Sequence, residues 1–316
     1  MILFSADWHI KLGQKNVPVA WASQRYDMFF AKLTELEAKC DLHIVGGDLF
    51  DRVPTLEEQE LYWKFIMGVT IPTIIYDGNH EATKKHKTFF TTLKAATEKL
   101  NPLVTIIYEV YEDPRFTILP YTELHRKGSI EALDSTKPLF THVRGEIPPH
   151  VKPEVDLDRF TKFPMVFAGD LHSHSNTQKN IIYPGSPMTT SFHRTAVHTG
   201  CILIDETDWS WTWTEISLPQ LIRLTVTDPV DMVPTVYDHT IYEIEGDLQD
   251  LASVKNSDLL DKKVVKRSSE ATLVLDKDMS VSDELVEYLL YILELPENKI
   301  PDIVGVFNDY SVQQAE

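Results

Sequence analysis

The sequence is poor in features that mark large classes of proteins. It has only two cysteines, Cys40 and Cys201, among 316 residues, too few for a framework of disulfides. Its first residues, "MILFSADWHI", lack the basic region and the long apolar run of a signal peptide. No hydrophobic run approaches the roughly 20 residues that span a bilayer. We therefore expect a cytoplasmic protein that is not inserted in a membrane.

Basic residues are also scarce. The chain has 30 Lys and Arg against 48 Asp and Glu, a formal net charge of -18, which argues against binding nucleic acid by bulk electrostatics because such binding needs clustered cations. The acidic excess is concentrated from Leu218 onward, where 20 acidic and 8 basic residues occur. Two interpretations stay open for this acidic end: a solvated face that aids solubility, or a surface for a basic partner.

The sequence is rich in alternating strand and helix patterns. Hydrophobic residues make up 43% and charged residues 25% of the chain, as in a soluble protein with one large domain and a smaller second one. Short apolar runs that each end in a polar cluster indicate buried strands, namely "MILFS", "LHIVGG", "TIIYDG", "PLFTHV" and "PMVFAG". Helical spacing of apolar residues predicts helices over residues 23–39, 55–67 and 88–100. This alternation is typical of an α/β fold.

The later runs change the pattern. "NIIYPG", "GCILID" and "WSWTWTEI" follow one another without a long helix between them, so we expect them to form a second sheet packed on the first. A sandwich of two sheets flanked by helices results. After "SLPQ", the runs "LIRLTVTDP" and "TIYEIEG" predict a separate small unit that begins near Pro219, with a basic patch of Lys262, Lys263, Lys266 and Arg267.

The C-terminal part predicts an amphipathic helix. The segment "SVSDELVEYLLYILEL" opens with a serine in the capping position and acids in the first turn. Before Pro296 it places one apolar stripe, which consists of Leu285, Leu289, Ile292 and Leu293. A second helix is predicted to start within "IPDIVGVFNDY".

Potential metal ligands recur at the ends of five predicted strands. In chain order these ends carry Asp7 with His9, Asp48, Asn79 with His80, His142, and Asp170 with His172. Each motif alone has an ordinary alternative as a turn or a core histidine, but five in succession point to one site. Carboxylate, imidazole and amide groups together suit two divalent ions, since oxygen favours Mg and Mn while imidazole favours later transition metals. Two such ions, bridged by one carboxylate, would promote hydrolysis of a phosphate ester.

These motifs carry a family resemblance. The set "DWH", "GDLFD", "GNHE", His142 and "GDLHSH", followed by "YPGSP", resembles the calcineurin-like metallophosphoesterases. Within them it is similar to the SbcD-type (Mre-eleven-like) nuclease subunit of the double-strand-break repair exonuclease complex, and the short length resembles the bacteriophage members. The resemblance extends from Met1 to about Ile216. It implies an α/β four-layer sandwich, with two mixed sheets flanked by helices, a small α+β capping domain and a C-terminal helix.

The resemblance also implies domains and residue roles. We expect a nuclease domain at residues 1–217, a capping and DNA-binding domain at 218–280, and a helical segment at 281–316. Roles are carried over for eight residues: Asp7, His9 and His172 for one metal, Asn79, His142 and Asp170 for the second, Asp48 as the bridge and His80 as the catalytic histidine. The implied cofactors are two divalent ions, Mn(II) first and Mg(II) second. The implied activity is a DNA exonuclease on duplex ends, 3'-to-5', with endonuclease activity on single strands.

Partners follow from the same resemblance. Family members work with an SbcC-type ATPase that has a long coiled coil, as a homodimer within a heterotetramer. The stripe around Leu285 would dock on that coiled coil, or else pack against the chain's own capping domain. The ATPase can supply much of the DNA-binding surface, and the candidates for local DNA contacts are Arg52, Lys84, Lys85 and Lys87. On charge pattern alone the lysines fit a solvated loop equally well. If a phage encodes the chain, the compartment is the host cytoplasm.

Several alternatives compete with a nuclease. "GDLFDR" and "GNHE" also resemble the protein serine/threonine phosphatases, but Asp77 stands where those enzymes have a substrate-binding arginine. A small-nucleotide phosphodiesterase is the next enzymatic alternative. An inactive scaffold subunit is the non-enzymatic one, and the competent residue at every ligand position argues against it.

One ligand position is ambiguous. In "FAGDLHSHSN", residues 167–176, the resemblance leads us to expect Gly-His-x-His where the chain has Gly-Asp-x-His. Either Asp170 or His174 could therefore complete the second metal site. We favour Asp170, because Gly169 ends the apolar run directly before it.

Overall fold

The structure is a computed structural model that describes residues 1–84, 86–265, 279–293 and 295–313. By its internal contacts the chain divides into two compact units. The first consists of Met1–Leu224 with Met232–Tyr242, and the second of Thr225–Asp231 with Glu243–Glu316. Within the described ranges, no helix combines the length and the apolar character needed to cross a membrane. Three residues named above, Lys85, Lys266 and Arg267, lie outside the described residues.

A mixed six-stranded sheet lies in the middle of the first unit, in the order β13-β12-β1-β2-β3-β6. Its strands are β1 (Ile2–Ser5), β2 (Leu42–Gly46), β3 (Thr73–Tyr76), β6 (Val104–Ile107), β12 (Gly200–Ile204) and β13 (Trp211–Glu215). The neighbours β1, β2, β3 and β6 run parallel. Their carboxyl ends therefore share one edge of the sheet, and the predicted ligands after β1, β2 and β3 meet there.

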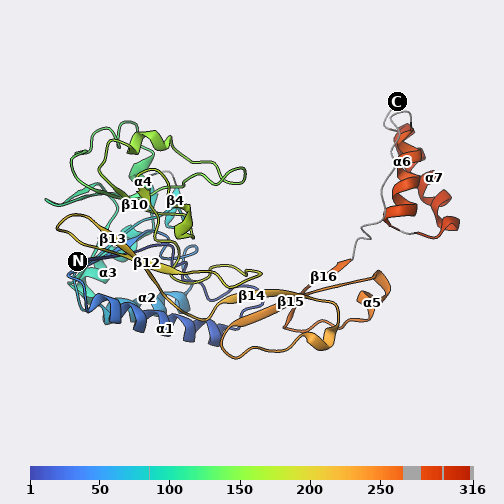
Figure 1. Ribbon diagram of the computed structural model, residues 1–316, viewed down its shortest axis with the longest axis horizontal. Coiled ribbons are helices and arrows are strands. Elements are labelled where there is room, and N and C mark those ends of the chain that lie inside the picture. The colour runs from blue at the N-terminus through green and yellow to red at the C-terminus, as the bar shows by residue number, and fades with distance from the viewer. Residues whose placement is uncertain (85, 266–278, 294, 314–316) are drawn as a thin grey trace. The chain divides into compact units, whose positions relative to one another are not determined.

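Three helices cover one face of this sheet (Figure 1), namely α1 (Val19–Glu37), α2 (Leu56–Gly68) and α3 (Phe90–Leu100). They match the predicted ranges to within a few residues. A capping box starts α2: the Thr55 hydroxyl accepts a hydrogen bond from the Glu58 amide at 3.3 Å, and the Glu58 carboxylate accepts one from the Thr55 amide at 2.9 Å. Their apolar faces bury Tyr26, Phe29 and Tyr62 in one core cluster with the sheet.

The second sheet has five strands in the order β11-β10-β9-β8-β7. They are β7 (Tyr111–Glu112), β8 (Thr117–Leu119), β9 (Leu139–His142), β10 (Val166–Gly169) and β11 (Ile181–Ile182). The expectation that the three later runs form this sheet was wrong for two of them. "GCILID" and "WSWTWTEI" contain β12 and β13, which extend the first sheet beside β1, and only "NIIYPG" joins the second. Pairing with β12 covers an edge of β1 that would otherwise present unpaired backbone groups.

The two sheets pack face to face around aromatic side chains. Phe4 of β1 contacts Phe140 of β9 and Phe167 of β10, with ring centroids 5.3 Å and 6.0 Å apart. Another core cluster covers the outer face of the second sheet, with residues from α4 (Tyr121–Leu124) and from the 3-10 helix Leu157–Phe160. In Figure 1, α1 and α2 lie below the first sheet and α4 lies above the second. The predicted four-layer sandwich is confirmed.

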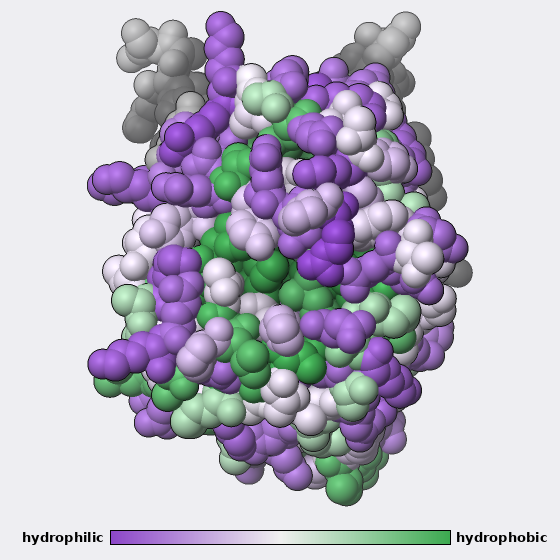
Figure 2. All heavy atoms as spheres, turned by 90° about the vertical axis from the view of Figure 1, so that its left-hand side faces the viewer, coloured by the Kyte–Doolittle hydropathy of each residue, from purple (hydrophilic) through white to green (hydrophobic). Residues whose placement is uncertain are grey.

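Apolar residues are also visible at the surface of the molecule (Figure 2). Figure 2 shows the left-hand face of Figure 1, where hydrophobic residues gather in a central hollow and hydrophilic residues surround it. Some exposed apolar surface is normal for a soluble protein. We assign this hollow no function.

The remaining strands are short. A hairpin of β4 (Ala82–Lys84) and β5 (Lys87–Thr88) directly follows the "GNHE" motif. A three-stranded sheet has the order β14 (Leu221–Val226), β15 (His239–Gly246) and β16 (Leu260–Val265), and α5 (Leu248–Ser253) contacts β16. Single 3-10 turns occur at His174–Asn176, Pro229–Asp231 and Glu297–Lys299.

Two helices that contact each other end the second unit, α6 (Val281–Glu287) and α7 (Ile300–Gln313). Ser280 caps α6, because its hydroxyl accepts a hydrogen bond from the Asp283 amide at 3.2 Å. The one long helix expected here is interrupted, since Tyr288–Ile292 form a π-helix, and a π turn shifts the side chains that follow around the helix axis. Of the predicted stripe, Leu289 is buried, Leu285 and Ile292 are half-buried, and Leu293 is exposed.

Candidate metal centre

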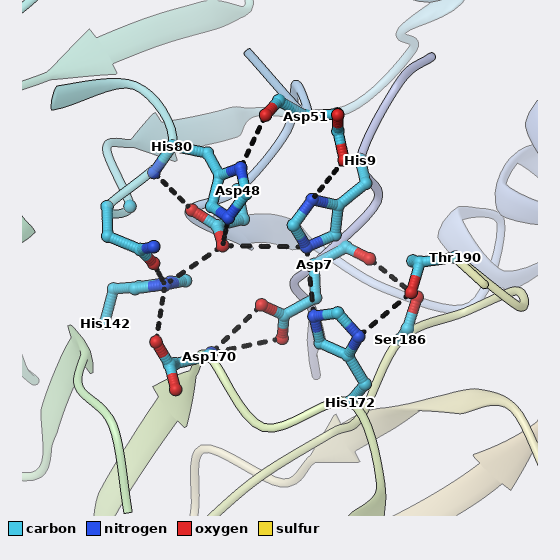
Figure 3. A network of polar contacts seen from close by, with 12 residues as sticks. Asp7, His9, Asp48, Asp51, His80, His142, Asp170, His172, Ser186 and Thr190 are labelled. Atoms are coloured by element: carbon cyan, nitrogen blue, oxygen red, sulfur yellow. Dashed lines mark hydrogen bonds and ion pairs between the residues drawn. The ribbon is translucent and has the colours of Figure 1, made fainter. Parts of the chain in front are cut away.

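Five loops bring the predicted ligands together at the carboxyl ends of β1, β2, β3, β9 and β10. Figure 3 shows their side chains pointing toward one another. Three overlapping groups have ligand atoms within 4.8 Å of one another. These groups are Asp7 with His9 and His172, His9 with Asp48 and His80, and Asp7 with Asp48 and His142. Residues from both sheets therefore form one cluster.

Asp48 lies in the middle of the cluster. Its Oδ2 atom is 3.6 Å from Nε2 of His9 and 3.5 Å from Nε2 of His142. Its Oδ1 atom accepts a hydrogen bond from the His80 amide at 3.0 Å. Burial would raise the pKa of Asp48, but the nearby histidines hold that pKa below its usual range. An ionised carboxylate between two groups of ligands suits a bridging role.

His9 and His172 face each other on one side of Asp48. Their Nε2 atoms are 3.0 Å apart, and Nδ1 of His172 is hydrogen bonded to the Thr190 hydroxyl at 3.0 Å. Desolvation within the cluster and the field of His9 lower the pKa of His172 to about 4. The His172 ring is therefore neutral at pH 7, so one of its nitrogens carries a lone pair. Two converging imidazoles beside the Asp7 carboxylate suit a divalent cation.

His142 occupies the other side of Asp48 and is fully buried. Its Nδ1 donates to the Gly46 carbonyl at 2.9 Å, and its Nε2 is 2.9 Å from Oδ1 of Asn79 and 3.9 Å from Oδ1 of Asp170. Burial would lower the pKa of His142, but the charge of Asp48 and of the other carboxylates raises it well above its usual range. A divalent cation bound by the same groups would compete with a proton at Nε2 of this ring.

The side chains of Asp170 and His174 point in different directions, and only that of Asp170 points into the cluster. The Asp170 carboxylate lies in the cluster, and its amide donates to Asp7 at 3.0 Å. His174 instead donates from Nδ1 to the Tyr183 carbonyl at 2.6 Å, and its ring stacks on Trp213 at a centroid distance of 5.6 Å. The geometry favours Asp170 as the ligand, and the assignment stays a prediction.

His80 is the most open member of the cluster, with its side chain 35% exposed. Its Nδ1 donates to the Asp51 carbonyl at 2.5 Å, which leaves Nε2 toward the centre, 3.9 Å from Oδ2 of Asp48. A ring held in this way can exchange a proton with a substrate from solvent. The same ring also lies within ligand distance of His9 and Asp48.

Glu81 supports the ligands, and the sequence analysis did not single it out. This buried carboxylate accepts hydrogen bonds from three amides, those of Asp48 at 2.9 Å, Phe50 at 2.9 Å and Gly78 at 2.8 Å. It thus ties the loop after β2 to the loop after β3. Burial and the charge of Asp48 raise the pKa of Glu81 to about 8. The "GNHE" motif contains this residue, but only the fold reveals its three partners.

Arg144, Asp51 and Thr190 also contact the ligands and were missed. Arg144 donates to both carboxylate oxygens of Asp170, Asp51 lies 3.6 Å from Nδ1 of His9, and Thr190 bonds His172. Asp51 lies within the quoted motif "GDLFD", and Thr190 lies three residues beyond the quoted motif "YPGSP". No sequence signal marked Arg144.

The ligand loops have unusual backbone. Four ligand residues have a positive φ: Asp7 (57°), His9 (46°), Asp48 (51°) and Asp170 (105°). Non-glycine residues rarely adopt such angles, and they are found where surrounding structure enforces them, often at functional sites. The glycine before Asp170 is also required, since a Cβ on Gly169 would lie 2.4 Å from the Gly46 carbonyl oxygen.

The remaining predicted site residues lie outside the cluster. Arg52 forms ion pairs with Glu58 at 3.0 Å and with Asp51 at 3.7 Å. Lys84 and Lys87 are exposed on the β4–β5 hairpin.

A cavity of about 750 Å³ opens beside Asp170 and His172, and Met188, Thr190 and Trp213 line part of it.

The donor set fits two divalent ions. Buried carboxylates and imidazoles converge, with Nε2 of His9 3.0 Å from Nε2 of His172 and 3.6 Å from Oδ2 of Asp48. Ions held by these groups would supply Lewis acidity and a water activated for attack on a phosphoryl group. The protein's part is to orient the ligands, to hold His80 at the open side and to keep Asp48 ionised.

Comparisons with known proteins identify the family of this chain. Residues 1–173 match the family described as "Calcineurin-like phosphoesterase". The chain is 41% identical over 315 residues to the "Probable exonuclease subunit 1" of Escherichia phage T5, with 96% of each chain covered. Similar solved structures include an archaeal phosphodiesterase (14% identity, TM-score 0.38) and a Thermus thermophilus protein (11% identity, TM-score 0.43), each match covering 68% of this chain and 98% of the other. The chain therefore belongs to the calcineurin-like phosphoesterase family and is a phosphoester hydrolase that uses divalent metal ions.

Proposed function

We propose that the protein is the nuclease subunit of a DNA-processing complex. Its reaction is hydrolysis of DNA phosphodiesters, as an exonuclease on duplex ends with 3'-to-5' polarity and as an endonuclease on single strands. The observation that carries the proposal is the convergence of carboxylates and imidazoles around Asp48, with His80 on the solvent side. The word "exonuclease" in the name of the phage T5 relative supports DNA as the substrate.

The metal assignments follow the two sides of Asp48. The first ion would be held by Asp7, His9 and His172, and the second by Asn79, His142 and Asp170, with Asp48 shared. Three carboxylates make this a hard donor set, which favours Mn(II), and then Mg(II), over softer ions. His80 would protonate the leaving oxygen or stabilise the transition state, since its Nδ1 is fixed on the Asp51 carbonyl.

The proposal includes partners. The name "subunit 1" of the relative supports an assembly, and we propose an SbcC-type coiled-coil ATPase, with this chain as a homodimer in a heterotetramer. The docking segment would be residues 281–316, with Leu285, Leu289, Ile292 and Leu293. Arg52, Lys84, Lys85 and Lys87 would make local phosphate contacts. The buried thiols of Cys40 and Cys201 suit the reducing cytoplasm of a host cell.

One assay tests the activity against its alternatives. The purified protein with Mn(II) receives duplex DNA labelled at either 3' or 5' end, a phosphopeptide and a cyclic nucleotide, alone and with the proposed ATPase partner. We expect release of nucleotides from the 3' end, and no product with Asp48→Asn. Faster hydrolysis of the phosphopeptide or of the cyclic nucleotide would favour the corresponding alternative enzyme. A protein that binds metal but hydrolyses none of these substrates would favour the scaffold.

A further inference from the structure

Arg144 touches the metal centre from outside the predicted ligand set. It lies two residues beyond His142, and its backbone amide donates to Glu154 at 2.9 Å. Its Nε and Nη2 atoms donate to Oδ2 and Oδ1 of Asp170, each at 3.3 Å. The Arg144 side chain remains 43% exposed, whereas that of Asp170 is 6% exposed. The guanidinium is therefore partly exposed to solvent beside Asp170, a predicted ligand of the second metal.

Among the described residues, one nitrogen of this guanidinium makes no hydrogen bond. Arginine carries five N–H donors in a planar fork, and the two bonds to Asp170 use Nε and one hydrogen of Nη2. In the ranges that the structure describes, Nη1 has no hydrogen-bond partner. The carboxylates of Asp170 and Glu154 both stabilise the positive charge of Arg144 and raise its pKa. An arginine with one edge fixed and the other open is preorganised for a planar anion such as phosphate.

The positive charge of Arg144 offsets an extra negative charge among the predicted metal ligands. Asp7, Asp48 and Asp170 place three carboxylates among the ligands, whereas the resembling motif has an imidazole in place of Asp170. The extra carboxylate lowers the net positive charge that two divalent ions would present to an anionic substrate. Arg144, in contact with that same carboxylate, restores one unit of positive charge on the side that faces solvent.

We propose that Arg144 forms a phosphate-binding subsite of the metal centre. Its Nε edge stays on Asp170, and its Nη1 edge binds a non-bridging oxygen of the phosphodiester that is cleaved. The inference rests on the proposed function and deepens it by naming the group that holds the scissile phosphate. A lysine would keep the charge but lacks the fork, so it should serve only in part.

The test separates phosphate binding from metal binding. Arg144→Gln and Arg144→Lys are compared with Arg159→Gln, since Arg159 makes a similar two-bond pair with Glu131, at 2.7 Å and 2.8 Å, away from the cluster. Calorimetry measures Mn(II) stoichiometry first and then binding of inorganic phosphate to the Mn(II)-loaded protein. For Arg144→Gln we expect two Mn(II) sites and phosphate affinity reduced roughly 10- to 100-fold, as loss of a charged hydrogen bond implies. The phosphate affinity of Arg144→Lys should lie between those of the wild type and Arg144→Gln. The phosphate affinity of Arg159→Gln should equal that of the wild type.

Three results would overturn the inference. Unchanged phosphate affinity in Arg144→Gln is the first. Loss of the second Mn(II) site is the second, because Arg144 would then only orient Asp170. The third comes from Arg144→Gln combined with Asp170→His: full recovery of phosphate affinity would show that Arg144 only cancels the carboxylate's charge.

The same proteins separate this inference from the nuclease proposal. Hydrolysis of bis(4-nitrophenyl) phosphate, a simple phosphodiester, is measured beside DNA. A wild type that cleaves the small diester and not DNA refutes the nuclease, while an Arg144-dependent phosphate affinity still supports the subsite. A wild type that cleaves DNA, with Arg144→Gln equal to it in phosphate affinity, refutes the subsite alone.

Discussion

The metal centre and the C-terminal helices differ in how far their side chains are buried. In the centre, Asp7, Asp48 and His142 are at most 2% exposed, and each is bonded to loops from other strands. In the C-terminal helices, Tyr291 is 52% and Val306 is 71% exposed. Burial of apolar surface stabilises a protein by about 25 cal/mol per Å², and an exposed apolar side chain does not gain this stabilisation. All the predicted metal ligands lie in the first unit, so single substitutions there should alter the chemistry without the involvement of a partner.

Among cluster residues that are not assigned as metal ligands, His80 should give the largest loss when it is replaced by alanine. We expect DNA hydrolysis to fall roughly 10²- to 10⁴-fold, the range for loss of a general acid, while Mn(II) binding stays nearly intact. Rates on labelled duplex DNA and Mn(II) calorimetry measure the two effects. Because His80 also lies close to His9 and Asp48, loss of metal in this variant would make it a ligand and overturn the assignment.

Asp170→Ala should give the next largest loss of activity. We expect it to lose the second metal and at least roughly 100-fold in rate, about 2.7 kcal/mol of barrier, because a carboxylate ligand and the partner of Arg144 disappear together. Asp170→His is the matched control and should remain active, since imidazole is a competent ligand. Metal analysis after gel filtration would contradict the assignment if Asp170→Ala retained two ions.

Thr190→Val tests the support of a ligand. It removes the 3.0 Å contact with Nδ1 of His172 at nearly constant volume. Such outer contacts are worth roughly 10- to 100-fold in metal affinity, and we expect the low end because His172 keeps its other neighbours. Thr190→Ser should restore the affinity. Equal Mn(II) affinity in all three proteins would show that the ring is oriented by packing alone.

Removal of residues 281–316 tests the other side of the comparison. The truncated chain should fold and keep weak nuclease activity, because no ligand lies in that segment. It should no longer co-purify with the ATPase. Stoichiometric co-purification would place the docking surface elsewhere, and an insoluble product would indicate that the helices pack against the chain's own capping domain.

His174→Ala should have the smallest effect. Its ring stacks on Trp213 and its Nδ1 bonds the Tyr183 carbonyl, so we expect activity within about twofold of the wild type, well below the effect of losing a charged ligand contact. A dead His174→Ala beside a tolerated Asp170→Ala would instead establish the shifted pair, His172 with His174, as ligands.

Sequence patterns captured the cluster because its members follow strands whose order could be inferred. Asp7, Asp48 and Asn79 each come after a short apolar run, and parallel strands bring such ends to one edge. The sheet of β12 and β13 was misassigned, because strand pairing is non-local and an apolar run does not state its neighbour. The apolar periodicity of this segment predicted a continuous α-helix and gave no sign of the π turn at Tyr288–Ile292.

The partners of the ligands were beyond sequence patterns for a related reason. Arg144 meets Asp170 across 26 positions of the chain, and Glu81 meets Phe50 across 31. Neither pair has a fixed spacing that a motif could encode. Their contacts exist only once β2, β3, β9 and β10 have assembled.

The left-handed backbone at Asp7, His9 and Asp48 sets catalysis against heat tolerance. Glycine adopts these angles without penalty, whereas another residue held there costs on the order of 1–3 kcal/mol. Glycine at any one of them would relieve this strain but would remove a ligand, and at Asp7 or Asp48 it would also remove the acceptor of a backbone hydrogen bond. The strain is thus a cost in folding stability that the chain carries for its metal centre.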